Sequence, residues 1–229
     1  MTRIYLIDYS RLGEIPPELN RDQLSVASYA ARRVLAILYG IRYGVKMPEI
    51  ARTRHGKPYF AGGEADAYFS ISHTDKYAVA VLTDEGECGI DIECESSAHR
   101  AERVEGRFLS TVDFALPPTA NQPDVLVARL DNPLGTSALC ELTVGKERRP
   151  FDDVAYPLRG RSLTELPVNA NLSPLSRWTL LEAALKADGR GFGAYKSADS
   201  IMHTVSARHY LFFDGEKKYY LSLAIKSVQ

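Results

Sequence analysis

The spacing of apolar residues along the chain predicts helices in three places. Apolar side chains recur at three- and four-residue steps over residues 23–43 and 175–187, as in a helix that packs one face against a core. Asp22 can cap the first of these helices, and Gly44 follows its end, where glycine is common. A helix is also expected over residues 99–110.

Short apolar or alternating segments predict strands before and after these helices. The expected strands are residues 3–9, 67–72, 77–83, 88–93, 200–213 and 217–225. Only short turns separate the second, third and fourth segments, which predicts an antiparallel meander. The last two strands meet at Asp214 and Gly215, a dipeptide typical of tight hairpins.

The order of these elements, a helix followed by strands, occurs twice. It predicts an α+β fold of two pseudo-symmetric halves, residues 1–95 and 96–229, each with a helix on a small, mainly antiparallel sheet. Residues 112–177 form an irregular, enlarged connection with only short β-like pieces at 124–130 and 138–144. We expect added hairpins or an excursion there, because structureless stretches of this length are uncommon in compact domains.

The balance of charged residues argues against two classes of protein, non-specific nucleic-acid binders and proteins that dock on membranes through a polybasic surface. Among 229 residues, 28 Lys and Arg nearly balance 29 Asp and Glu, so the net charge is −1. This balance removes the broad attraction that non-specific nucleic-acid binding and polybasic membrane docking need, but it permits a local anion site. We therefore expect neither nucleic acid nor membrane as a partner.

The location expected from the sequence is the cytoplasm. The first apolar run, residues 4–7, is interrupted by Asp8, and no run approaches the roughly 18 apolar residues of a spanning helix. The three cysteines, Cys88, Cys94 and Cys140, show no CxxC spacing, which favours reduced thiols over a disulfide framework or a zinc site.

The most informative segment is residues 89–93, GIDIE. In a strand, Asp91 and Glu93 share one face while Ile90 and Ile92 point toward a core. Two carboxylates at one strand end repel each other, and Mg²⁺ is commonly held by one or two such groups plus water and phosphate. The alternative for an isolated pair of this kind is an exposed polar strand face.

A second segment, residues 178–186, reads WTLLEAALK. On a helix Glu182 and Lys186 stand one turn apart on one face, and Trp178, Leu181 and Leu185 form an apolar stripe. Taken alone, the Glu–Lys pair is typical of a solvated surface. Two shorter motifs precede it, GKP at residues 56–58 and SISHT at 70–74, and each by itself is an ordinary turn or strand end.

In this order the four motifs resemble the 4′-phosphopantetheinyl transferases, specifically the larger, surfactin-synthetase-activating class. The resemblance covers residues 20–95 and 176–226. It implies a two-half α/β fold that binds coenzyme A between its halves, with Mg²⁺ on the pyrophosphate. It also implies that a serine of an apo acyl or peptidyl carrier protein attacks the β-phosphate and releases 3′,5′-ADP.

Carried over by position, the resemblance assigns a role to each motif. The implied metal ligands are Asp91, Glu93 and Glu182. The implied cofactor-binding residues are Lys57 and Pro58 along the adenine, Ser72 and His73 on phosphates including the 3′-phosphate, and Lys186. The implied catalytic residues are Glu182, as base for the serine, and Lys186, which contacts the phosphates and can protonate the leaving group.

The sequence departs from the family in three ways. Leu181 stands where the family usually has a lysine, and Arg177 or Arg190 could replace that charge. The stretch between Glu93 and Trp178 is longer than usual, and the basic helix that commonly precedes residues 23–43 is shortened or absent. The rival hypothesis is therefore a non-catalytic or weakly active relative that binds coenzyme A or a carrier protein.

Overall fold

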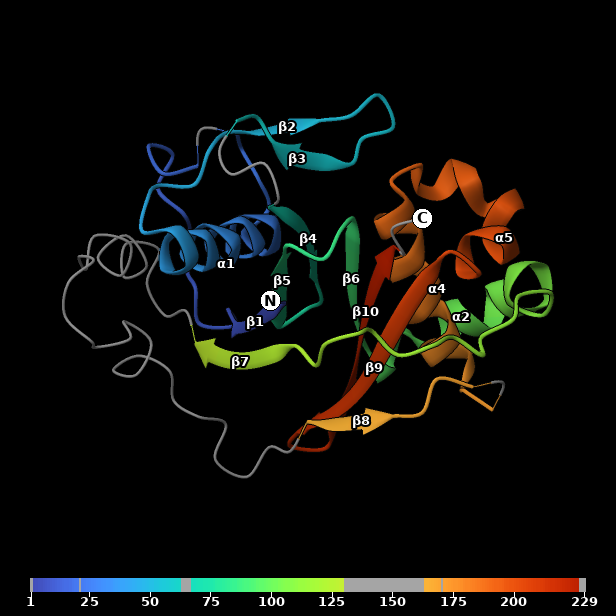
Figure 1. The fold of residues 1–229 in the computed structure, drawn as a ribbon. Coiled ribbons are helices and arrows are strands. Elements are labelled where there is room, and N and C mark those ends of the chain that lie inside the picture. Colours follow the sequence, from blue (N-terminus) through green and yellow to red (C-terminus); the bar gives the residue numbers. More distant parts are fainter. Residues whose placement is uncertain (1, 21, 63–66, 130–162, 170, 227–229) are drawn as a thin grey trace.

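A computed structural model describes residues 2–20, 22–62, 67–129, 163–169 and 171–226. Its helices are α1 (Val26–Tyr43), α2 (Ala98–Val104), α4 (Pro174–Asp188) and α5 (Ala198–Met202) (Figure 1). Its strands are β1 (Arg3–Asp8), β2 (Ile50–Arg52), β3 (Pro58–Phe60), β4 (Tyr68–His73), β5 (Tyr77–Thr83), β6 (Cys88–Cys94), β7 (Asp124–Arg129), β8 (Thr164–Leu166), β9 (Val205–Asp214) and β10 (Lys217–Lys226). Short helical turns cover Glu95–Ser97, Glu105–Leu109 and Gly191–Ser197.

Both long helices begin at a serine cap and end at a glycine. The Ser25 side chain accepts a hydrogen bond from the Ser28 amide, and Gly44 ends α1 at a φ of 69°. The helix therefore starts at Val26, later than expected, and Ser25 takes the capping role predicted for Asp22. Ser173 caps α4 in the same way, and Gly189 ends it at a φ of 84°.

The strands form two four-stranded sheets and one small hairpin. The first sheet has the order β4-β5-β1-β7, the second has the order β6-β10-β9-β8, and β2 pairs with β3. β7 runs parallel to β1, and the other pairs are antiparallel. The α+β class with mainly antiparallel sheets is confirmed, while the twofold relation between the halves stays a prediction.

Two expectations about the strands are wrong. β6 does not continue a meander after β5, because its ladder is formed with β10 in the other sheet. Residues 198–202 are helix α5, so the strand expected from residue 200 begins at Val205. The closing hairpin is confirmed, with Gly215 at a φ of 61° between β9 and β10.

The chain division expected at residue 95 does not coincide with the division into sheets. β6 belongs to the first segment of sequence but lies in the second sheet, and β7 crosses back to the first. Strands β7 and β8 lie within the expected irregular connection, whereas its β-like piece at 138–144 falls outside the described residues.

The helices and sheets stack in four layers, α1, first sheet, second sheet and α4 (Figure 1). β5 is buried on both faces: Ala78, Ala80 and Leu82 pack toward α1. Its alternate residues Tyr77, Val79 and Val81 pack against the second sheet. The core between the sheets thus joins the two sheets over a broad apolar area.

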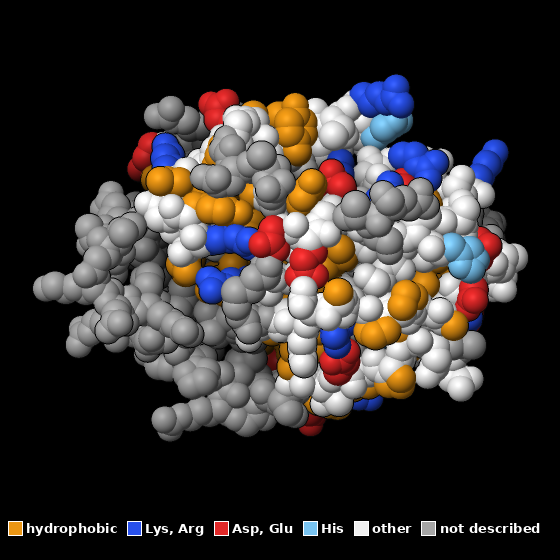
Figure 2. All heavy atoms as spheres, viewed as in Figure 1, with side chains coloured by type: hydrophobic (Ala, Val, Ile, Leu, Met, Phe, Trp, Pro, Cys, Tyr) orange, Lys and Arg blue, Asp and Glu red, His pale blue; other side chains and the backbone are white. Residues whose placement is uncertain are grey.

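The outer surface is of mixed charge. Basic and acidic side chains are interspersed on the face of the described residues shown in Figure 2. None of the helices seen in the described ranges is both long and apolar enough to cross a bilayer. Cys88 and Cys94 are buried free thiols, as expected, and burial raises the pKa of the Cys88 thiol to about 12.

A close contact between a helix and a sheet occurs at Gly89 in β6. A Cβ atom there would lie 1.9 Å from the Ala183 carbonyl oxygen and 2.5 Å from the Ala187 amide nitrogen of α4. Both alanines are fully buried. Only a residue without a side chain lets the helix backbone lie this close to the strand.

Replacing Gly89 with alanine is expected to push α4 away from β6. The free energy of unfolding should fall by about 3 kcal/mol, since neither backbone group can yield as a flexible side chain would. Chemical denaturation measures the loss. Gly106→Ala is the matched control, because its Cβ would meet nothing within 4 Å; equal stability of the two variants would contradict the close contact.

Candidate active site

Three separate elements meet around the ammonium group of Lys186. Its Nζ lies 2.6 Å from Asp91 Oδ1 of β6, 3.1 Å from Ser72 Oγ of β4 and 3.1 Å from the Ile90 carbonyl oxygen. Ser72 Oγ in turn donates to Asp91 Oδ1 at 2.8 Å. Motifs that are 19 and 95 residues from Asp91 in sequence are therefore joined in one hydrogen-bonded cluster.

The alternation predicted for residues 89–93 is confirmed. Ile90 and Ile92 are buried in the core between the sheets, while the neighbouring Asp91 lies on the face that α4 covers. The Asp91 side chain is not part of an exposed polar face, because the residue is only 3% exposed. Its Oδ2 atom is buried without a hydrogen-bond partner among the described residues.

Glu182 lies on α4 one turn before Lys186. Burial, and then the nearby charges of Asp91 and Glu93, raise its pKa to about 8, although Lys186 acts in the opposite direction. Burial and Asp91 also raise the pKa of Glu93, against opposing contributions from Ser97, Arg100 and Lys186. The site thus holds more carboxylate than one lysine can neutralise.

The donor set suits a hard divalent cation. Carboxylate oxygens are the ligands that Mg²⁺ prefers, and the buried Asp91 Oδ2 has a hydrogen-bonding capacity that the surrounding protein does not satisfy. Within the described ranges, the side chains of His, Cys, Asp and Glu do not already form a three-ligand metal group. Lys186 contacts Asp91 Oδ1 instead, so the magnesium site stays a prediction.

Ser72 and His73, at the end of β4, differ in their surroundings. Ser72 belongs to the Lys186 cluster, as described above. His73 lies toward α1, with its Nε2 3.5 Å from Ser28 Oγ. Burial, followed by the charge of Lys186, lowers the pKa of His73, which favours a neutral imidazole at pH 7.

Lys57 reaches the end of α4 rather than the Lys186 cluster. Its Nζ donates to the Ala187 carbonyl oxygen at 2.9 Å and also pairs with Glu87. Its side chain lies against Gly189, beside the helix end where a cation is favoured. Pro58 opens β3 on the same small hairpin. The adenine contact of both residues stays a prediction.

The missing lysine of the family motif is replaced by a core residue. Leu181 is 0% exposed and belongs to the apolar cluster around α4. Both arginines considered as substitutes already have acidic partners: Arg177 pairs with Glu105, and Arg190 pairs with Asp188.

Sequence reasoning did not identify Tyr195, which follows α4 in a short helical turn. Its ring stacks on Trp178 with centroids 6.1 Å apart. Burial and the charges of Glu182 and Asp91 raise the pKa of its phenol, which places it near the acidic groups. No motif contains it, and a tyrosine after a glycine-rich turn is too common to single out.

A second group of polar residues that the sequence did not reveal lies beside Asp91, on the next two strands of the same sheet. Ser222 of β10 is the register partner of both Asp91 and His209. The His209 Nδ1 atom lies 2.9 Å from Ser222 Oγ, and burial lowers the pKa of this histidine to about 4. The polar character of the site therefore continues as a buried row across three strands.

Comparison with known proteins gives a partial similarity. No protein-family model matches the chain. The protein called "Uncharacterized protein YieE" from Escherichia coli, in strains K12 and CFT073, is 40% identical over 105 residues. The match covers 44% of this chain and 42% of each relative, so the chain spans less than half the length of these relatives.

The burial of Leu181 predicts that a lysine there harms the fold. Leu181→Lys should lower the free energy of unfolding by at least about 3 kcal/mol, because it leaves an uncompensated charge in an apolar cluster. Leu181→Met, which keeps an apolar side chain of similar size, is the control and should cost less than about 1.5 kcal/mol. Equal denaturation midpoints for the two variants would contradict the burial.

The raised pKa of Glu182 predicts a pH-dependent stability. Between about pH 5 and 8 the unfolded chain ionises this group while the folded chain holds the proton, so stability falls as pH rises. In buffer with a chelator, Glu182→Gln should therefore gain more than about 1 kcal/mol relative to the unmodified protein between pH 5.5 and 8.5. The exposed Glu102→Gln provides the control. A stability difference for Glu182→Gln that does not change with pH would contradict the prediction.

Proposed function

We propose that the protein is a magnesium-dependent transferase that moves 4′-phosphopantetheine from coenzyme A to a serine of an apo acyl or peptidyl carrier protein. The observation that carries the proposal is the convergence of Ser72, Asp91 and Lys186 in one hydrogen-bonded cluster, with Glu182 one helical turn away. These residues come from three of the four motifs on which the family resemblance rests. We place this activity in the cytoplasm.

The charge of the site supports handling of a pyrophosphate. The ammonium group of Lys186 donates to the Asp91 carboxylate, and it can donate to phosphate oxygens when the substrate binds. Lys57 and His73 add cationic or hydrogen-bonding groups from the first part of the chain. A divalent cation held by Asp91, Glu93 and Glu182 would supply positive charge that stabilises the phosphates.

The proposed proton movements involve Glu182 and Lys186. A serine hydroxyl is a weak nucleophile, and a base with a pKa near the working pH accepts its proton best. In the metal-free site the pKa of Glu182 is raised to about 8, and a bound divalent cation would favour its deprotonated form, which can accept the proton. The serine oxygen forms a bond to the β-phosphorus, the bond to the 3′,5′-ADP oxygen breaks, and Lys186 can protonate the leaving group.

A second candidate function is supported by Leu181. An apolar, fully buried side chain replaces the lysine that the family motif usually places before Glu182. A relative that binds coenzyme A or a carrier protein without transferring the group would tolerate this replacement. The two candidates differ in whether a covalent adduct forms on the carrier.

Intact-mass spectrometry of apo carrier proteins incubated with coenzyme A, Mg²⁺ and the protein tests the proposal. We expect a mass increase of one phosphopantetheine group on the carrier serine, together with release of 3′,5′-ADP. Binding of coenzyme A without an adduct on any carrier of a broad acyl and peptidyl panel would reject the transferase and support the binding relative.

Asp91→Ala and Glu182→Gln should each reduce the transfer rate by about a hundredfold or more, because each removes a charge that acts on the reacting phosphates or the proton. Initial rates of adduct formation measure the effect. Glu102→Gln is the control on an exposed helix position and should transfer normally. Unchanged rates in both site variants would show that the site is misplaced.

A further inference from the structure

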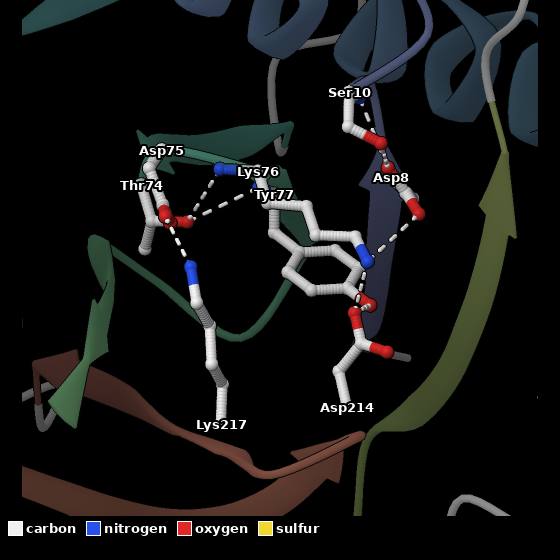
Figure 3. A network of polar contacts seen from close by, with 8 residues as sticks. All are labelled: Asp8, Ser10, Thr74, Asp75, Lys76, Tyr77, Asp214 and Lys217. Carbon is white, nitrogen blue, oxygen red and sulfur yellow. Dashed lines mark hydrogen bonds and ion pairs between the residues drawn. The ribbon is translucent and has the colours of Figure 1, made fainter. Parts of the chain in front are cut away.

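A network of polar contacts joins the two halves at the turn that follows His73 (Figure 3). Lys76 extends between two carboxylates: it pairs with Asp214 at the end of β9, and its Nζ lies 3.5 Å from Asp8 Oδ2 at the end of β1. The Tyr77 hydroxyl donates to the same Asp214 Oδ2 at 2.8 Å. We call these four residues, Asp8, Lys76, Tyr77 and Asp214, the hairpin latch.

The latch is largely sheltered from water. The side chains of Asp8 and Asp214 are 4% and 10% exposed, and that of Lys76 is 28% exposed. Asp8 is further held by Ser10, whose amide and hydroxyl both donate to Oδ1. Charged hydrogen bonds in such surroundings are stronger and more directional than the same contacts at an exposed surface.

The latch is adjacent to a residue of the candidate active site. Ser72 is the second-last residue of β4, and the turn at residues 74–76 leads directly into Tyr77 of β5. The turn is closed by a hydrogen bond from the Thr74 amide to the Tyr77 carbonyl oxygen. It is also attached to the chain just after β1, since the Tyr9 amide donates to the Lys76 carbonyl oxygen at 3.0 Å.

Apolar packing between the two sheets defines their relative position less closely than the polar contacts of the hairpin latch do. The Tyr77 ring meets Phe212 and Tyr219 of the second sheet edge-on, with centroids 5.3 and 4.9 Å away. Aromatic pairs accept a range of offsets, whereas a hydroxyl–carboxylate bond and an ion pair require short, aligned contacts. The latch therefore supplies directional contacts at one end of a non-directional interface.

That alignment matters at Ser72 because its hydroxyl bridges the two sheets. It lies within hydrogen-bond distance of Asp91 and Lys186 in the second sheet and α4, so a displacement of about 1 Å between the sheets would break both contacts. A second bridge runs in parallel: the Ile90 amide of β6 donates to Ser70 Oγ of β4 at 3.1 Å.

We infer that Asp214 is a positioning residue of this site. By holding Lys76 and Tyr77, it sets the place of β4 against β6 and so aligns Ser72 with Asp91 and Lys186. The inference deepens the proposed function, on which its kinetic test rests, but its effect on the β4–β6 contact can be measured without any activity.

Hydrogen exchange of the Ile90 amide, followed by NMR, is the first test. In Asp214→Asn this amide should exchange about tenfold faster relative to the amides of the β9–β10 ladder, because the β4–β6 contact opens locally. Tyr77→Phe, which removes one hydroxyl from a buried ring, should act in the same direction and replaces Asp214→Asn if that variant does not fold. The control is Lys217→Gln, which breaks the exposed ion pair with Asp75 and should leave the ratio unchanged.

The inference would be overturned if, in both latch variants, the exchange rate of the Ile90 amide rose by the same factor as the rates of the β9–β10 amides. That result would mean that the latch contributes to general stability alone. The outcome does not depend on whether the protein is a transferase.

A double-mutant cycle with Ser72→Ala is the second test. Asp214→Asn should lower kcat/KM for transfer about tenfold in the unmodified background and have little effect when Ser72 is already replaced. Equal reductions in the two backgrounds would show that Asp214 does not act through Ser72. Absence of transfer in the unmodified protein would reject the proposed function and leave the exchange result as the measure of the latch.

Discussion

The contact between α4 and β6 determines where the candidate active site can form. Gly89 has no side chain, so the backbone of Ala183 and Ala187 lies directly on the strand. The contact also brings the neighbouring residues of both elements close together. Asp91 is two positions after Gly89 in β6, and Lys186 directly precedes Ala187 on the helix. A larger residue at position 89 would separate the elements and lengthen the 2.6 Å contact between Lys186 and Asp91. The close packing of α4 on β6 and the contact between Lys186 and Asp91 therefore both depend on the absence of a side chain at Gly89.

That contact also explains the electrostatic imbalance of the site. Bringing α4 onto β6 buries Glu182 beside Asp91 and Glu93, while among the described residues Lys186 supplies the positive charge that pairs with Asp91. Burying such an excess of carboxylate is unfavourable, which is why the pKa of Glu182 is raised. Structural sites usually avoid this cost, whereas sites that handle phosphate and divalent cations use it to bind positive charge. The imbalance is therefore the physical reason for favouring a catalytic interpretation over a purely structural one.

Local patterns in the sequence predicted local structure well and long-range pairing poorly. The alternation around Asp91 and the C-terminal ends of both long helices follow from side-chain periodicity and glycine, which act within a few residues. The position of β6 in the other sheet could not be predicted, because turn spacing does not show which strand accepts its hydrogen bonds. Likewise, the pattern placed Leu181 in an apolar stripe but could not show that α4 is covered so completely that this residue is fully buried. The partner of Lys186 is a third case, since spacing suggested Glu182 and the fold supplies Asp91.

We propose that Asp91, Glu93 and Glu182 hold a divalent cation beside a pyrophosphate that Lys186 contacts. A crystal structure of the protein grown with coenzyme A and Mn²⁺ tests it most directly, because Mn²⁺ gives an anomalous signal and accepts the same oxygen ligands as Mg²⁺. We expect an anomalous peak among the three carboxylates, next to Asp91 Oδ2, with coenzyme A phosphate oxygens in contact with Lys186. Coenzyme A bound elsewhere, or bound here with no metal at these carboxylates, would contradict it.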